Sequence, residues 1–280
     1  MTLRITNWED LTFISEEVDP DSNEFQYTSF GLIDDTDTFH YGQLNNPKTS
    51  ISLENLTAAL NPIPDNTILP PWPPSEANLR KAPDPPPANV HIKRPTLELY
   101  SMLKKMGIEK QMSSALVAEA QVLEELSQHP HPNLIRYHGC RVARGHITGL
   151  VLDRHPHDLQ IHVKHGYELD KALFMAALES VILHLHGLGW AHNDLTPTNV
   201  LVSEAGMPVL IDFSGCQKLG TKLVHIRGTK GWIEGEVGDH NTSEAGHDTF
   251  ALGKIRVWLE DAGLRQEMMM KIFYKGIKPV

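Results

Sequence analysis

Two carboxylates and an amide stand close together in the segment between residues 192 and 212. Asp194 and Asn199 belong to HNDLTPTN, and Asp212 follows the apolar run MPVLI. Aspartate and asparagine oxygens suit Mg²⁺, which needs few protein ligands when phosphate groups complete its coordination shell. Phosphoryl transfer requires such a metal site, a cation on the phosphates and a carboxylate that orients the attacking hydroxyl. We therefore expect Asn199 and Asp212 to bind Mg²⁺ and Asp194 to act as the base.

A predicted hairpin brings these groups together. The runs VLV and MPVLI are separated by a four-residue turn that ends at a glycine. Pairing across this turn sets Val202 opposite Met207 and places Asp212 next to Asn199. The competing interpretation is that the aspartate and the asparagine of HNDLTPTN only cap turns, which both residue types do often.

Several helices and strands must hold these residues in place. Apolar residues recur at helical spacing from Phe174 to Leu185, and Gly187 ends the pattern, so residues 169–186 form the clearest predicted helix. The loop with Asp194 follows this helix. The run HITGLVLD predicts a buried strand at 146–153. Further helices are expected at 96–106, 113–127 and 249–262.

Proline divides the chain. Ten of the 19 prolines lie between Pro62 and Pro87, in a stretch that favours extended, semi-rigid geometry. We expect a boundary near residue 90. Residues 1–89 would then be an N-terminal segment with a proline-rich arm at 62–87, able to add strands to the domain that follows. The fold of residues 1–60 is not assigned.

Composition restricts the class of protein. The 25 basic and 35 acidic residues give a formal charge of −10, which disfavours nucleic-acid binding through phosphate neutralisation. No run approaches the ~20 apolar residues of a membrane-spanning helix. The two cysteines are too few for a disulfide framework, and the start of the chain lacks the pattern of a secretory signal. An intracellular location, cytoplasmic or nuclear, is expected.

Six motifs together resemble the eukaryotic protein kinases. HNDLTPTNVLV resembles their catalytic loop, VLIDFSG their metal-binding aspartate motif, and GTKGWIEGE (228–236) the end of their activation segment. HDTFALG is similar to the start of the central helix of the large lobe and carries its buried aspartate, Asp248. VHIKRP places Lys93 like the phosphate-contacting lysine, and Glu119 stands where its carboxylate partner is found. HPHPNLIRYHGC (129–140) matches the loop and strand that follow.

The resemblance implies an α+β, two-lobed protein kinase-like fold with a truncated helical large lobe. Within a domain over 90–280, the small lobe would cover about 90–155 and the large lobe about 156–280. ATP and Mg²⁺ are the implied cofactors. Lys93 would contact the phosphates, Asn199 and Asp212 the metal, and the segment around Leu152, Asp153 and His155 the adenine. Asp194, Lys93 and Glu119 are the implied catalytic residues.

The helix expected at 113–127 supports the role given to Glu119. Leu116, Leu123 and Leu126 stand at −3, +4 and +7 from this acid, so it shares their apolar stripe. An acid that faces a core is costly unless it is paired, and Lys93 is the natural partner. The alternative is an acid at the edge of the stripe that reaches solvent.

The chain also departs from the kinase pattern. No G-x-G-x-x-G precedes Lys93, so nucleotide phosphates would lack the usual glycine-rich loop. Ser214 stands where the metal motif has glycine, and Thr196 replaces a lysine of the catalytic loop. Asn193 replaces an arginine, which argues against activation through a phosphorylated loop that pairs with that arginine. Only 27 residues follow Gly253.

Three functions fit these observations. The leading prediction is an ATP- and Mg²⁺-dependent protein kinase that transfers the γ-phosphate to serine or threonine of an unassigned protein substrate. The first alternative is a pseudokinase, a nucleotide-binding or interaction scaffold, which the missing glycine loop favours. The second is a small-molecule phosphotransferase related to the aminoglycoside phosphotransferases, which share H-x-D-x-x-x-x-N; GTKGWIEGE argues for the protein kinase side.

A group of histidines offers one further site. His155, His157, His162 and His165 crowd HPHDLQIHVKH. Zinc binding is disfavoured, because the spacing is mixed and no cysteine is near. We expect these residues to be exposed on the chain that follows the adenine-contacting segment.

Overall fold

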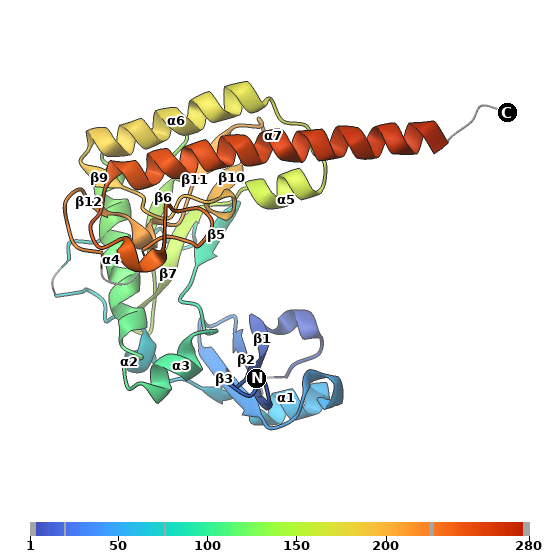
Figure 1. Ribbon diagram of the computed structural model, residues 1–280. Coiled ribbons are helices and arrows are strands. Elements are labelled where there is room, and N and C mark those ends of the chain that lie inside the picture. Colours follow the sequence, from blue (N-terminus) through green and yellow to red (C-terminus); the bar gives the residue numbers. More distant parts are fainter. Residues whose placement is uncertain (1–3, 20, 76, 224–226, 277–280) are drawn as a thin grey trace. The chain divides into compact units, whose positions relative to one another are not determined.

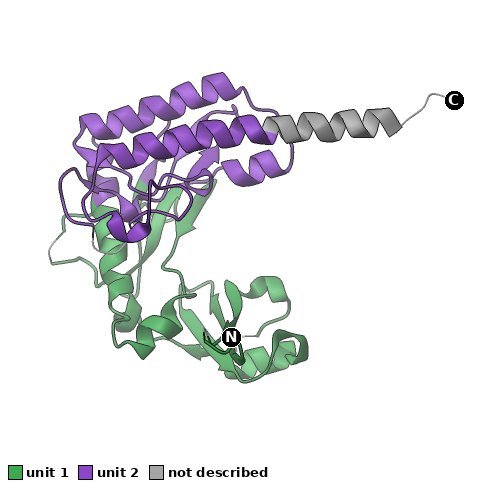
Figure 2. Cartoon of the chain, viewed as in Figure 1, with its two compact units in different colours: residues 1–121, 138–152 green, residues 122–137, 153–280 purple. Residues whose placement is uncertain are grey.

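The structure is a computed structural model that describes residues 4–19, 21–75, 77–223 and 227–262, and the backbone alone of residues 263–276. The chain forms two compact units, each treated by itself below (Figure 2). Unit 1 comprises residues 1–121 and 138–152, and unit 2 comprises residues 122–137 and 153–280. The boundary predicted near residue 90 falls inside unit 1. Within the described part of the chain, no helix is long and apolar enough to cross a bilayer.

Unit 1 begins with an antiparallel sheet in the order β1-β2-β3-β4 (Figure 1). Its strands are β1 (Phe13–Val18), β2 (Phe25–Ile33), β3 (Phe39–Leu44) and β4 (Asn61–Pro62), and helix α1 (Leu53–Ala59) precedes β4. One core cluster joins Phe30 and Leu32 of β2 to Leu56 of α1. Because the other face of the sheet is also covered, β2 is buried continuously from residue 28 to residue 32.

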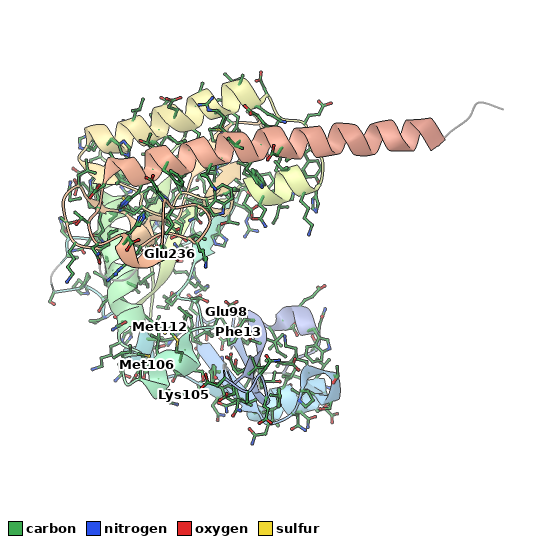
Figure 3. The ribbon with its side chains drawn as sticks, viewed as in Figure 1. Phe13, Glu98, Lys105, Met106, Met112 and Glu236 are labelled. Atoms are coloured by element: carbon green, nitrogen blue, oxygen red, sulfur yellow. The ribbon has the colours of Figure 1, made fainter. Side chains whose placement is uncertain are left out.

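The second core of unit 1 covers that other face. Phe13 of β1 and Phe39 of β3 pack with Leu97, with Tyr100 of α3 (Tyr100–Lys105) and with Met112 of α4 (Gln111–Leu126). Figure 3 labels Phe13 and Met112 within this region. The core therefore ties the N-terminal sheet to α3 and to α4, the helix on which Glu119 lies.

A separate three-stranded sheet has the order β5-β7-β6. It consists of β5 (Val90–Lys93), β6 (Tyr137–Ala143) and β7 (His146–Asp153). β7 has the bounds expected for the buried strand, whereas α3 is shorter than the helix expected at 96–106. α4 begins two residues before and ends one residue before the helix expected at 113–127.

The proline-rich arm, which includes helix α2 (Asp65–Ile68), runs beside β6 and β7. Ala82 N donates to Cys140 O (2.9 Å), and Ile147 N donates to Pro70 O (2.9 Å). The approach is close at Gly139, where φ is +123° and an added Cβ would lie 2.6 Å from Ala82 N. Only glycine fits there without a shift of the arm. Backbone hydrogen bonds, and not side-chain packing alone, thus hold the arm on this sheet.

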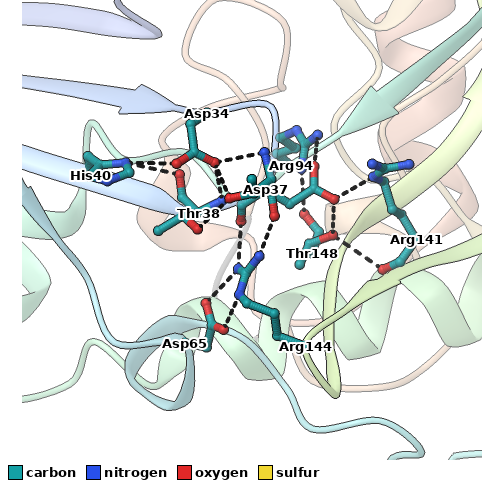
Figure 4. Close-up of polar contacts among 10 residues, drawn as sticks. Asp34, Asp37, Thr38, His40, Asp65, Arg94, Arg141, Arg144 and Thr148 are labelled. Atoms are coloured by element: carbon teal, nitrogen blue, oxygen red, sulfur yellow. Dashed lines mark hydrogen bonds and ion pairs between the residues drawn. The ribbon is translucent and has the colours of Figure 1, made fainter. Parts of the chain in front are cut away.

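Asp37 is the centre of a buried ion network in unit 1 (Figure 4). Its carboxylate is 2% exposed and accepts hydrogen bonds from Arg94, from Arg141 Nε (2.5 Å) and from Thr148 Oγ1 (3.3 Å). Arg144 binds the Asp37 carbonyl (3.0 Å). A carboxylate removed from water requires such donors. The network connects the β2–β3 turn to β6, β7 and the residue after Lys93.

Asp37→Asn is expected to destabilise the protein, because it removes the charge that pairs with two arginines while their desolvation remains. Arg94 and Arg141 are 20% and 30% exposed, so water compensates part of the lost pairing. The free energy of unfolding should therefore fall by about 2–3 kcal/mol, less than for a fully buried pair. Urea denaturation measures it. Asp35→Asn, at an exposed position in the same turn, is the matched control and should change stability by less than ~0.5 kcal/mol. Equal stabilities of the two variants would contradict this account.

Unit 2 is mainly helical, with short strands. Helix α6 (Lys171–Gly187) buries Phe174, Leu178 and Leu185 on the predicted stripe, and its N-cap Asp170 accepts from Leu173 N (3.0 Å). The remaining elements are α5 (Leu159–Lys164), α7 (Ala245–Gly276), β8 (His157–Asp158), β9 (Trp190–Ala191), β10 (Val200–Val202), β11 (Pro208–Leu210), β12 (Gln217–Lys218), η3 (Pro197–Asn199), η4 (Phe213–Gly215) and η5 (Val237–Asp239).

The β10–β11 hairpin forms, but its predicted register was wrong by one residue. Val202 lies opposite Pro208 and not opposite Met207. Ser203 explains the difference, because its N donates to Met207 O (2.9 Å) and its Oγ accepts from Met207 N (3.1 Å). Met207 therefore belongs to the turn, which is one residue longer than expected.

With the longer turn, the predicted metal ligands Asn199 and Asp212 still lie at neighbouring positions of the hairpin. Ile211 N donates to Asn199 O (3.0 Å), and Asp212 is the next residue along the chain. The corrected register brings the backbone of Asp212 one residue nearer to Asn199 than the predicted register did.

Candidate active site

The catalytic loop follows β9 and is anchored by Asp248. Both carboxylate oxygens of Asp248 accept backbone hydrogens, from His192 N and Asn193 N (2.8 Å each), and His186 Nε2 lies 2.9 Å from one of them. Asp248 has 0% exposure in the first turn of α7. The positive field of a helix N-terminus adds to these donors. The chain direction at Asp194 is thereby fixed.

β9 itself is held by a polar cluster with Glu125 of α4. Trp190 Nε1 donates to Glu125 Oε1 (3.1 Å), and Lys218 of β12 pairs with the same oxygen. The Lys218 ammonium also lies over the Trp190 ring, 4.2 Å from its centroid. The hydrogen bond from Lys218, and then that from Trp190, hold the pKa of Glu125 below its usual value against the effect of burial.

The structure brings Asp194 and Asn199 together. Asn199 Nδ2 donates to Asp194 O (2.8 Å) and approaches Asp194 Oδ2 (3.4 Å). The other carboxylate oxygen, Asp194 Oδ1, accepts from Thr229 Oγ1 (2.6 Å). The carboxylate is thus oriented from two sides, by the loop itself and by the segment that begins GTKGW. Such support is what an orienting base requires.

Thr229 is a site residue that the sequence interpretation did not single out. Its position in GTKGWIEGE could have indicated a role in the site, but its contact with Asp194 spans 35 positions of the sequence. The preceding Gly228 has φ +96°, and an added Cβ would lie 3.2 Å from the Asn193 carbonyl oxygen and closer still to Ile233. Glycine therefore permits the close approach that places Thr229 on the carboxylate.

Asp212 adopts the left-handed conformation (φ 62°), which is uncommon for residues other than glycine. Its Oδ1 accepts from Ser214 N (3.3 Å) and from Ser214 Oγ (2.5 Å). The serine that replaces the usual glycine thus fixes the carboxylate of the metal motif.

The donor set fits Mg²⁺. Among the described residues, the side-chain hydrogen bonds of Asn199 are donated by Nδ2, which leaves Oδ1 as a ligand oxygen. Asp212 adds a carboxylate at the base of the same hairpin. Hard oxygen ligands of this kind, with phosphate oxygens and water, are those that Mg²⁺ accepts.

Lys93 and Glu119 form the contact expected from the leucine stripe. Lys93 Nζ donates to Glu119 Oε1 (2.6 Å), with the side chains 27% and 5% exposed. Leu116 and Leu123 beside the acid are 6% and 2% exposed. The acid therefore faces the core and does not reach solvent at the edge of the stripe.

The segment expected to contact adenine lies at the end of β7. Leu152 is buried, with 6% exposure, whereas Asp153 and His155 are partly exposed. Asp153 N already donates to Arg136 O (3.1 Å), so this N–H is not available to a ligand. Adenine binding by these three residues stays a prediction.

The structure places three histidines of this group around one tyrosine ring. Among the described residues, no three His, Cys, Asp or Glu side chains converge as around a metal ion. The rings of His157, His162 and His165 instead pack against Tyr167, at centroid distances of 5.5, 5.2 and 5.5 Å.

Comparison with known families decides the classification. The family model for the protein kinase domain matches residues 93–262, which is more than half of the chain. The chain belongs to the protein kinase family. Its α+β protein kinase-like fold, predicted from the six motifs, is confirmed by this match.

Individual relatives are more distant. The serine/threonine-protein kinase/endoribonuclease IRE1 of Hypocrea jecorina (strain QM6a) is 30% identical over 164 residues, 51% of this chain and 12% of that protein. The serine/threonine-protein kinase TAO3 of Xenopus laevis is 28% identical over 170 residues, 58% of this chain and 18% of that protein. This kinase chain thus spans less than a fifth of these relatives. The solved structure of the Cydia pomonella Granulovirus kinase PK-1 is 22% identical, with a TM-score of 0.41 over 49% of this chain and 52% of that one.

Lys93→Met is expected to lower stability and to weaken nucleotide binding. The change leaves a buried carboxylate without its lysine partner, at a cost on the order of 1–3 kcal/mol after allowing for the exposure of Lys93. Urea denaturation of Lys93→Met, Glu119→Gln and the double variant measures the coupling between them. Lys110→Met, at an exposed position of the same unit, is the control. Additive effects, with no coupling energy, would refute the pairing.

Asp212→Asn is expected to weaken Mg²⁺-dependent nucleotide binding by about 10-fold or more, because the hairpin site loses its carboxylate. Calorimetric titration with Mg·ATP, and with ATP in EDTA, measures the difference. Glu204→Gln removes an exposed carboxylate from the turn of the same hairpin and should leave both titrations unchanged. Unchanged Mg·ATP affinity in Asp212→Asn would count against a metal site here.

Proposed function

We propose that this protein is an ATP- and Mg²⁺-dependent protein kinase that transfers the γ-phosphate to serine or threonine. The observation that carries the proposal is the orientation of the Asp194 carboxylate by Asn199 and Thr229. A carboxylate held from two sides is suited to receive an acceptor hydroxyl. Membership of the protein kinase family supports the use of ATP and Mg²⁺, which protein kinases employ generally.

Each unit contributes separate groups. In unit 1, Lys93 binds nucleotide phosphates, and Glu119 holds the ammonium in place. In unit 2, Asn199 and Asp212 hold Mg²⁺, which when bound neutralises phosphate charge. Asp194 accepts a hydrogen bond from the substrate hydroxyl and takes up its proton as the phosphoryl group is transferred.

The preference for serine or threonine of a protein rests on two observations. GTKGWIEGE resembles the end of a protein kinase activation segment, and both relatives described above are named serine/threonine-protein kinases. The identity of the protein substrate is not part of the proposal.

A pseudokinase is the second candidate, and one observation favours it. No G-x-G-x-x-G precedes Lys93. The sequence therefore lacks the glycine-rich loop whose backbone N–H groups usually cover the nucleotide phosphates. In a scaffold the same polar residues would bind nucleotide without transferring phosphate.

Asp194→Asn separates the two candidates. In a kinase the change should leave Mg·ATP binding nearly intact and slow transfer by ~10²–10⁴, which is typical of the loss of a general base. That factor corresponds to about 3–5 kcal/mol of barrier. Transfer of radiolabelled phosphate to a generic protein substrate, or to the chain itself, measures the rate beside a binding titration.

The control is Asp261→Asn, which removes an exposed carboxylate on α7 and should keep the wild-type rate. If wild type and Asp194→Asn give the same background signal while both bind ATP, the kinase proposal fails and the scaffold is supported.

A further inference from the structure

Two histidine rings pack against each other beside the catalytic loop. The centroids of His240 and His247 lie 4.3 Å apart, with an interplanar angle of 33°. His240 is 7% exposed and ends the short helix η5, after the GTKGWIEGE segment. His247 lies in the first turn of α7, next to the anchor Asp248. The phosphoryl-transfer roles described above use neither ring.

The contact of His240 with Glu234 shows which ring nitrogen carries a hydrogen. Its Nε2 lies 2.7 Å from Glu234 O, and a carbonyl oxygen can only accept, so Nε2 carries the hydrogen. Its Nδ1 is buried and, within the part of the chain that the structure describes, has no hydrogen-bond partner. A second proton on Nδ1 would therefore create a buried donor without an acceptor.

The hydrogen bonds of Asn193 show in the same way which ring nitrogen of His247 carries a hydrogen. Asn193 Nδ2 donates toward Ala191 O, Gly215 O and Ser243 Oγ, each at 3.0 Å. Its Oδ1 is therefore the acceptor, and His247 Nδ1, 3.1 Å away, carries the hydrogen.

Asn193 connects His247 to the candidate base, Asp194. It is 2% exposed, with φ 63°, and directly precedes Asp194. A continuous series of contacts therefore runs from the Glu234 carbonyl through His240, His247 and Asn193 to the catalytic loop. Displacement of His247 would leave the Asn193 amide oxygen without this donor.

Proton uptake by His247 is unfavourable in this arrangement. Two positive rings at this distance repel each other. Glu244 and Asp248 are the acids whose fields act on His247, but Asp248 is already engaged by two backbone N–H groups and His186. Burial, and then His240, hold the pKa of His247 below its usual value. Since the folded pKa of His247 is depressed, its neutral form contributes stability that is fully present above the unfolded pKa of about 6.5 and is lost as the pH falls through the folded pKa.

We propose that His247 is a positioning residue for Asp194, acting through Asn193, and that the neutral His240–His247 pair holds the segment from Glu234 to His240 against the catalytic loop until protonation releases it. The effect on phosphoryl transfer rests on the proposed function. The release of the segment does not, and it can be measured in the absence of activity.

Tryptophan fluorescence of the full chain tests the release. Trp232 lies two residues before this segment, its N donates to Thr229 O (2.9 Å), and its ring meets Trp258 at a centroid distance of 6.2 Å. Titration from about pH 8 to about pH 5 should give a transition as the histidines charge. Trp232→Phe identifies the part of the signal that comes from this residue among the five tryptophans.

The decisive variant is His240→Gln with His247→Asn. Glutamine keeps a donor at the place of Nε2 and asparagine keeps one at the place of Nδ1, but neither side chain takes up a proton in this range. The transition should disappear. The control is His184→Gln, which removes another ring pair, His131–His184 at 5.1 Å, and should leave the transition in place. A transition that persists in the double variant, or one that is absent from wild type, overturns the proposal.

Kinetics test the positioning role. His247→Ala should lower kcat by roughly 10- to 100-fold at neutral pH with little change in KM for ATP, since a displacement of about 1 Å at a reacting group can cost that much. His247→Asn should restore kcat. In wild type kcat should fall between about pH 8 and about pH 5 as His247 charges, and in the double variant this fall should be absent. Equal damage in both single variants, or a change in KM alone, would leave His247 with a purely structural role and overturn the proposal. If wild type transfers no phosphate, the proposed function fails, and the fluorescence transition alone decides the inference.

Discussion

One buried carboxylate determines the geometry of the catalytic loop. Asp248 has no exposure and gains its stability from the N–H groups of His192 and Asn193 and from the contact with His186. A buried charge costs several kcal/mol unless such donors surround it, so the loop cannot leave without exposing or stranding the acid. The cost of burial thus becomes a constraint on the backbone. The position of Asp194 and its hydrogen bonds with Asn199 both follow from that constraint.

The same physical rule organises unit 1. Asp37 and Glu119 are buried acids, and each takes basic side chains from neighbouring elements, Arg94 and Arg141 in one case and Lys93 in the other. Because Arg94 directly follows Lys93, the network at Asp37 also restrains the end of β5 that presents the lysine. The Lys93 side chain itself is ordered by its contact with Glu119, which reduces the rotamer freedom that this long side chain would otherwise lose on binding a ligand.

Features that depend on residue spacing within one helix or strand were predicted from the sequence. The helix at α6, the strand at β7 and the acid on the leucine stripe depend on spacing within one element, and the structure contains all three. The fold of residues 1–60 was not assigned: β2 has both faces covered and lacks an alternating pattern, so its sequence does not indicate what each face packs against. The hairpin register depended on the side chain of Ser203, which adds a residue to the turn. Thr229 meets Asp194 across 35 positions, and no spacing rule anticipates such a contact.

The substitution of Asn193 for arginine changes how the catalytic loop can be coupled to the rest of unit 2. A buried guanidinium in this place would need an anion, and a phosphate on a neighbouring segment could supply it. An amide needs no counter-charge, and here every one of its polar atoms has a neutral partner within unit 2. Coupling through neutral groups is insensitive to added phosphate and sensitive to any proton that charges one of them. The two packed histidine rings are the titratable side chains of this series.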